Sequence, residues 1–170
     1  MHALGVWVAQ YLLWLMVAGF AAVWAFGEQR RGKITLGASA IFGLVLALVF
    51  MLIASHVHHD PRPFVDNPNI KPWFAHSPDN GFPSDHSIAA GLIAALVTWR
   101  HRLGGLVFCA AAAAIAWARV AAHVHHLQDV LAGLLLGGVA AAIAVAIVSA
   151  FLTRRITSSA APAHNEPPQH

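Results

Sequence analysis

Long apolar stretches alternate with short polar segments along this chain. Four stretches, residues 4–26, 34–54, 103–122 and 130–152, approach or exceed the roughly 20 residues that a helix needs to cross about 30 Å of hydrocarbon. A fifth, residues 87–99, is short for a full crossing, but it follows a polar loop that can dip below the headgroups. The pattern predicts an all-α integral membrane bundle with about five transmembrane helices.

The composition supports a membrane protein. The chain is 58% hydrophobic and 10% charged, which lies outside the usual range of soluble domains. Its net charge of +3 comes from short basic clusters without interleaved aromatic residues, so nucleic-acid binding is not expected. Cys109 is the single cysteine and lies in an apolar stretch, which excludes disulfides within the chain and cysteine-rich metal sites.

The basic residues predict the topology. Seven of the ten Lys and Arg residues follow the first, third and last helices of a five-helix arrangement: Arg30, Arg31, Lys33, Arg100, Arg102, Arg154 and Arg155. All seven then face one side, which the positive-inside rule makes cytoplasmic, and the N-terminus lies outside. We expect residues 1–155 to form one transmembrane domain. Residues 156–170, rich in Ser, Ala and Pro, are expected to form a disordered cytoplasmic tail.

Ionisable residues gather at the outer ends of the predicted helices. Placing such side chains at membrane depth costs free energy, so their presence there suggests a function. His125 and Asp129 are four residues apart at the start of the last helix, so they share one face. A carboxylate on one ring nitrogen fixes the tautomer and makes the other nitrogen a better nucleophile. Arg119, shortly before them, has the planar fork that suits phosphate oxygens.

Two further segments point to the same outer side. Residues 81–86, Gly-Phe-Pro-Ser-Asp-His, lead into the short third helix, so Ser84 is expected to cap it while free backbone amides face an anion beside His86. Residues 60–63, Asp-Pro-Arg-Pro, form a loop whose prolines stiffen the presentation of Arg62.

Structural interpretations stand beside these. A lone His-x-x-x-Asp pair can simply tie a loop to a helix, and Arg62 and Arg119 can anchor to lipid headgroups. The remaining histidines of the outer side lack the carboxylate or cysteine spacing of metal ligands, so no metal or cofactor is predicted. A haem protein is less favoured because the histidines gather at one face, and a transporter because polar groups are missing from the middles of the helices.

Together these residues resemble the three signature blocks of the type 2 phosphatidic acid phosphatase superfamily, which also includes vanadium-dependent haloperoxidases. The family blocks read Lys, six residues, Arg-Pro; then Pro-Ser-Gly-His; then Ser-Arg, five residues, His, three residues, Asp. The matching residues here are Arg62-Pro63, Pro83-Ser84-Asp85-His86, and Arg119, His125 and Asp129. The departures are Ser55 for the lysine, Asp85 for the glycine and Ala118 for the serine.

The resemblance implies an all-helical, metal-independent lipid phosphate phosphatase with a phosphohistidine intermediate. By resemblance, His125 attacks phosphorus, Asp129 orients it and His86 protonates the leaving oxygen. The phosphate-binding set is then Arg62, Ser84, Asp85 and Arg119, with Lys71, His58 or His59 as candidates to replace the absent lysine.

A narrower resemblance concerns the substrate. Residues 79–86 resemble the bacterial undecaprenyl pyrophosphate phosphatase branch of the superfamily. This implies a bacterial inner-membrane enzyme with its active site on the outer side and undecaprenyl pyrophosphate as the lipid phosphate partner. Phosphatidylglycerophosphate and phosphatidate are the alternative substrates.

Overall fold

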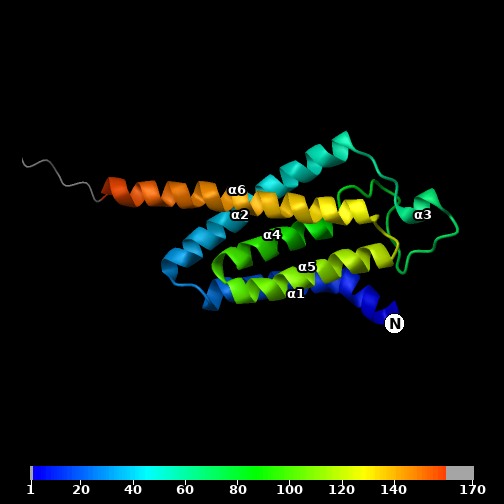
Figure 1. The fold of residues 1–170 in the computed structure, drawn as a ribbon, viewed down its shortest axis with the longest axis horizontal. Helices are drawn as coiled ribbons and strands as arrows, with labels where there is room; N and C mark the ends of the chain where they lie inside the picture. Colours follow the sequence, from blue (N-terminus) through cyan, green and yellow to red (C-terminus); the bar gives the residue numbers. More distant parts are fainter. Residues whose placement is uncertain (1, 160–170) are drawn as a thin grey trace, which may run out of the picture.

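The computed structural model describes residues 2–159. Within this range the chain forms six α-helices and no β-strand: α1 (His2–Phe26), α2 (Arg30–Val57), α3 (Pro63–Asp66), α4 (Asp85–Arg100), α5 (Arg102–Ala121) and α6 (Leu127–Ser159). The five long helices lie side by side, while α3 is a single turn in the loop between α2 and α4 (Figure 1).

The predicted membrane bundle of about five helices is confirmed. α1, α2, α5 and α6 are each long and apolar enough to cross a membrane. α4 is the predicted short fifth helix, with 16 residues and a length of about 24 Å. It contacts all four other long helices, and half of its residues are buried: Ser87, Ile88, Ala90, Gly91, Leu92, Ala94, Leu96 and Val97. A short helix fits the bundle because protein rather than lipid surrounds it.

The helices extend past the apolar stretches at several ends. The largest extension is in α6, which continues to Ser159, beyond the predicted domain boundary after residue 155. Residues 156–159 are therefore helical rather than part of an irregular tail, because backbone hydrogen bonding continues where hydropathy falls and no Gly or Pro intervenes. Residues 160–170 of the predicted tail lie outside the described residues.

The bundle has two unlike ends (Figure 1). What we call the site end carries the N-terminus, residues 58–84 with α3, and the turn at 122–126 between α5 and α6. The opposite, basic end carries the α1–α2 and α4–α5 corners and the C-terminal part of α6. At the basic end Arg100 donates Nε and Nη2 to the buried Glu28 carboxylate at 2.7 and 2.6 Å, and this hydrogen bonding lowers the pKa of Glu28.

Glycines bring the N-terminal parts of α4 and α6 into close contact. A Cβ atom on Gly133 of α6 would lie 2.6 Å from the Ser84 carbonyl oxygen, and one on Gly91 of α4 would lie 2.5 Å from the Leu134 carbonyl oxygen. Neither separation admits a side chain, so the two helices pack backbone to backbone here. This contact holds the start of α4 against the start of α6, where the ionisable residues gather.

Candidate active site

A folded loop brings the three ionisable segments together at the site end. Asn80 holds this loop: its Oδ1 accepts from the Asp60 and Phe82 amides, and its Nδ2 donates to the Ser55 and His58 carbonyls. The Gly81 amide donates to the Asp60 carbonyl at 2.8 Å. The Ser84 amide then donates to the Asp129 carbonyl at 3.1 Å, which ties the start of α4 to that of α6. The sequence blocks thus become one site.

His125 lies at the centre of this site and is almost fully buried. Its Nδ1 faces two acceptors, the Gly81 carbonyl oxygen at 2.9 Å and Asp129 Oδ2 at 3.4 Å, so Nδ1 carries the proton. Its Nε2 faces only donors, Arg62 Nη1 at 3.2 Å and Arg119 Nη2 at 3.3 Å, so Nε2 presents a lone pair. The predicted His125–Asp129 pair is present, but the Gly81 carbonyl is the closer partner.

The protonation of His125 suits a nucleophile. Burial lowers its pKa most, and the Arg119 and Arg62 guanidiniums lower it further, against the opposing effect of Asp129. The imidazole is therefore neutral near pH 7, with its free lone pair between two cations. A phosphoryl group held by those cations meets this lone pair directly.

The two arginines of the site, Arg62 and Arg119, are both buried. Arg62 donates Nε to Asp79 at 2.9 Å and Nη1 to the Val124 carbonyl at 2.7 Å, so it also fixes the turn that carries His125. Arg119 lies 2.9 Å from His76 through Nη2, and its Nε has no partner. Burial raises the pKa of Asp79, but its hydrogen bond and charge interaction with Arg62 outweigh this and lower it overall.

Ser84 occupies the N-cap position of α4, but its predicted capping hydrogen bond is absent. Its hydroxyl is fully buried and has no partner. The expected free amides are also partly used, because the Ser84 amide binds Asp129 and the His86 amide binds Asp85 Oδ1 at 2.7 Å. The Ser84 hydroxyl is thus an unpaired donor at the start of α4 that an anion could use.

Asp85 and His86 form a pair at the first turn of α4. Asp85 Oδ1 lies 3.0 Å from His86 Nδ1 and 4.0 Å from Arg119 Nη2. A carboxylate repels phosphate, so these contacts favour Asp85 as the partner that orients His86 over a direct phosphate ligand. The other ring nitrogen of His86 is then left for proton transfer.

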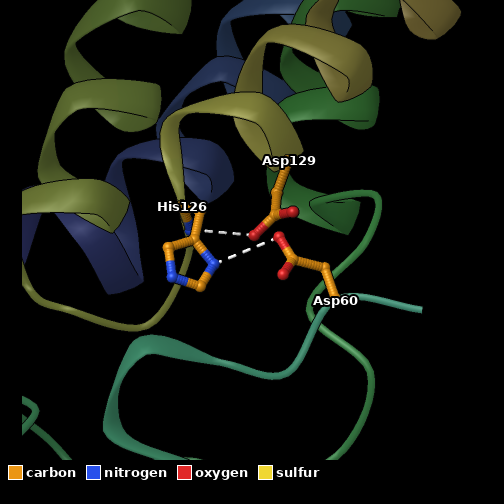
Figure 2. A group of neighbouring side chains, drawn as sticks. All are labelled: Asp60, His126 and Asp129. Carbon is orange, nitrogen blue, oxygen red and sulfur yellow. Dashed lines mark hydrogen bonds and ion pairs between the residues drawn. The ribbon is translucent and has the colours of Figure 1, made fainter. Parts of the chain in front are cut away.

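Three neighbouring side chains, Asp60, His126 and Asp129, each have an atom that can ligate a metal ion, and these atoms lie within 4.8 Å of one another (Figure 2). Such a group can hold a cation. Here most of its contacts are hydrogen bonds: Asp60 Oδ2 pairs with His126 Nδ1 at 3.1 Å and with Gln128 Nε2 at 2.5 Å, and Asp129 Oδ2 accepts from the His126 amide at 2.8 Å. A bound cation would compete for the carboxylate that faces His125, so metal independence stays our prediction.

Sequence reasoning missed two site residues. The Gly81 carbonyl is a backbone acceptor, which no side-chain spacing marks. His76 sits in a polar loop with no motif around it, yet its ring lies 6.2 Å from that of His125 and contacts Arg119. The three residues considered as substitutes for the family lysine, Lys71, His58 and His59, are exposed, whereas Arg62, Arg119 and His125 are buried. They had been candidates only because each is basic or titratable and lies on the predicted outer side of the membrane.

A neutral histidine lone pair between two buried arginines, in a helical membrane bundle, is an arrangement suited to binding and transferring a phosphoryl group. The chain belongs to the PAP2 superfamily, whose family model matches residues 36–152. This match confirms the resemblance found in the sequence. It covers α4, α5 and the segments that carry Arg62, His125 and Asp129.

Two curated relatives come from Bacillus. The bacitracin transport permease protein BcrC of Bacillus licheniformis is 29% identical over 130 residues, which are 76% of this chain and 63% of that protein. The undecaprenyl-diphosphatase BcrC of Bacillus subtilis (strain 168) is 28% identical over 154 residues, 89% of this chain and 72% of that protein. The chain thus spans under two thirds of the first relative's length.

A solved structure shares the fold. The crystal structure of Aquifex aeolicus LpxE superimposes with a TM-score of 0.67 at 20% sequence identity, over 84% of this chain and 86% of that one. At this identity the likeness concerns the arrangement of helices alone, which it supports over most of the bundle.

Proposed function

We propose that this protein is a metal-independent lipid phosphate phosphatase that works through a phosphohistidine intermediate, with undecaprenyl pyrophosphate as its substrate. The observation that carries the proposal is the His125 imidazole, whose Nδ1–H is held by Gly81 and Asp129 while its Nε2 lone pair faces Arg62 and Arg119. The family membership and the name of the Bacillus subtilis relative support it.

The reaction proceeds in two displacements at phosphorus. His125 Nε2 attacks the terminal phosphoryl group, so that an N–P bond forms as the P–O bond to the lipid phosphate breaks. His86 donates a proton to the departing oxygen, and Arg62, Arg119 and the Ser84 hydroxyl hold the three equatorial oxygens. His86 then takes a proton from water, which attacks phosphorus, breaks the N–P bond and releases inorganic phosphate.

An apolar hollow supports a lipid substrate. It has a volume of about 710 Å³, lies between α4, α5 and α6, and is lined mainly by small residues, among them Gly91, Ala112 and Gly138. Its nearest lining residues, Gly91 and Leu134, come five positions after His86 and Asp129 on the same helices. That distance is about one and a half helical turns, so a hydrocarbon chain in the hollow can end in a headgroup at the site.

The test is phosphate release by the purified protein in detergent micelles. We expect kcat/KM for undecaprenyl pyrophosphate to exceed that for phosphatidylglycerophosphate and phosphatidate by at least about tenfold, or about 1.4 kcal/mol.

A chelator should leave the rate of phosphate release unchanged, and vanadate should inhibit because it adopts the five-coordinate geometry of the transferring group. A Gly138→Leu variant should lower kcat/KM for undecaprenyl pyrophosphate only. A Cβ atom at position 138 meets open space, so the leucine side chain can enter the hollow without disturbing the helices.

The outcomes separate the parts of this proposal. A better glycerolipid substrate would leave the chemistry intact and replace the polyprenyl assignment. Magnesium-dependent recovery of a chelated, inactive enzyme would contradict metal independence and direct attention to Asp60, His126 and Asp129. Absence of release from every lipid phosphate would reject the phosphatase itself.

We place the protein in a bacterial inner membrane, with the site end outward and the basic end in the cytoplasm. The seven clustered basic residues lie at the basic end, as the positive-inside rule requires for that orientation. The start of α1 is then outside, on the same side as the turn between α5 and α6 that carries His125 (Figure 1).

Cysteine labelling tests this orientation. In a Cys109→Ser background, Lys71→Cys at the site end and Gly104→Cys near the α4–α5 corner should react from opposite sides, since both positions are exposed. Asn80 is unsuitable because it holds the loop. An impermeant maleimide added to intact cells should label position 71 and not 104. The reverse pattern means that the site faces the cytoplasm.

Transport is the second candidate, favoured by the name of the Bacillus licheniformis relative. Transporters place polar groups near the midplane of the membrane. Here the buried charged residues lie at the two ends: Glu28 at the basic end, and Asp60, Arg62, Arg119 and Asp129 at the site end. Catalysis at one membrane face accounts for this distribution more directly.

A further inference from the structure

We propose that His76 is the third phosphate-binding cation of this site, and that it becomes charged by taking up a proton when the phosphate group arrives. This inference rests on the proposed function and extends it. The family lysine is missing at Ser55, whose hydroxyl instead donates to the Leu52 carbonyl of its own helix. The site therefore has two arginines where the family pattern has three cations.

His76 occupies the right place for the missing cation. Its Nε2 lies 2.9 Å from Arg119 Nη2, and its ring lies edge-on to His125 with the centroids 6.2 Å apart. A shallow surface hollow is lined by residues 75–77. His76 is half-buried, so its ring borders this hollow while its Nε2 contacts the buried Arg119.

The hydrogen bonding of His76 leaves polar groups around it without partners. Arginine only donates, so Nε2 must accept from Arg119 and the ring must be neutral. Its Nδ1 is buried without a well-formed hydrogen bond, although the Ser77 backbone acts on the ring to raise its pKa. The Ser84 hydroxyl and Arg119 Nε are buried and unpartnered too. An oxyanion supplies acceptors that these donors lack.

The charges around His76 explain why the proton is absent before phosphate binds. Burial lowers its pKa most, and Arg62 and Arg119 lower it further, to about 4. The charged and titratable groups that face it come from four surrounding segments: Arg62 before α3, Asp79 in the same loop, Arg119 on α5 and His125 before α6. Arg119 in turn lies 4.0 Å from Asp85 Oδ1 of α4 and donates to the Ala9 carbonyl of α1 at 3.4 Å.

A bound phosphate dianion reverses the balance. It neutralises the two guanidiniums and places negative charge beside the imidazole, so the pKa of His76 rises on binding. A proton is therefore taken up together with the anion. Because the pKa of His76 is higher in the complex, the affinity for the anion is highest at acidic pH and falls as pH rises through the pKa of His76 in the complex. A lysine would be charged throughout and would repel the arginines before phosphate binds.

The experiment measures proton uptake directly. Calorimetric titration of the full-length protein with tungstate, a tetrahedral dianion that does not itself titrate near neutral pH, is run in buffers of different ionisation enthalpy. Wild type should take up more protons per tungstate than His76→Gln, by about 0.5 proton or more near pH 7. His76→Gln should also bind about tenfold more weakly, and His76→Lys should bind tightly with the lower proton uptake.

The controls keep this inference separate from the proposed function. His59→Gln, an exposed histidine of the same end, should match wild type, and thermal unfolding verifies that each variant is folded. Equal proton uptake by wild type and His76→Gln, or a His76→Lys variant that binds no better than His76→Gln, would overturn the role of His76. Proton-linked binding without phosphate release from any lipid would uphold His76 and reject the phosphatase.

Discussion

Replacement of His125 by alanine is expected to abolish phosphate release, with kcat reduced by at least about 10⁴-fold, because it removes the Nε2 lone pair that contacts both Arg62 and Arg119. Asp129→Asn is expected to retain more, with a loss of about 10²-fold. The Gly81 carbonyl, at 2.9 Å, continues to hold the Nδ1–H when the carboxylate is gone. The measurement is steady-state phosphate release, with unfolding temperature as a check of folding.

The pH profile distinguishes an orienting carboxylate from a merely structural one. His125 must be neutral to attack, so activity falls as pH decreases through its pKa. Burial and the arginines lower that pKa, while Asp129 raises it. Asp129→Asn should therefore move the acidic limb of the kcat/KM profile to lower pH. An unmoved limb with normal folding would mean that Asp129 does not act through His125, and full activity of His125→Ala would end the mechanism.

Arg119→Lys is the second change for which we expect a large effect. The substitution keeps the positive charge but removes the planar guanidinium. In Arg119 that group contacts His76 and His125 through Nη2, while its Nε has no partner and is available to an oxyanion. Loss of one such transition-state donor costs about 10²- to 10³-fold in rate, or about 2.7–4 kcal/mol. We expect that loss in kcat/KM together with weaker inhibition by vanadate.

The matched control is Arg102→Lys. Arg102 is the first residue of the same helix, is exposed and lies at the opposite end of the bundle. It should leave kcat/KM and vanadate inhibition unchanged. Equal activity of the Arg119 and Arg102 variants would show that Arg119 contributes charge alone, as a headgroup anchor does.

The helices were predictable from the sequence because lipid imposes a length and a polarity on each of them. Even the short α4 was located, since topology required a fifth crossing and its residues, 85–100, are almost uninterrupted apolar sequence after the first turn. The C-terminal end of α6 was not predicted, because the hydropathy of residues 153–159 says nothing about whether hydrogen bonding continues beyond the membrane.

The grouping of residues in the candidate site was predictable in part. Block spacing located Arg62, Arg119, His125 and Asp129 because each belongs to a rigid helix end or a proline-stiffened loop. The contacts from the loop were out of reach. His76 lies 43 residues before Arg119 in the chain, and their contact depends on how residues 67–84 fold back. The unused Ser84 hydroxyl was hidden as well, since its place at a helix start predicts a cap.

Main-chain atoms make many of the bonds that join the site: the Gly81 carbonyl to His125, the Val124 carbonyl to Arg62, and the Ser84 amide to the Asp129 carbonyl. Peptide groups do not change when side chains are exchanged. Side chains of this loop that make none of the site's hydrogen bonds can therefore be exchanged without moving the site residues, provided that the path of the chain is kept. Such a construction leaves the exposed loop surface free to vary while the arrangement of His125 and the two arginines stays constant.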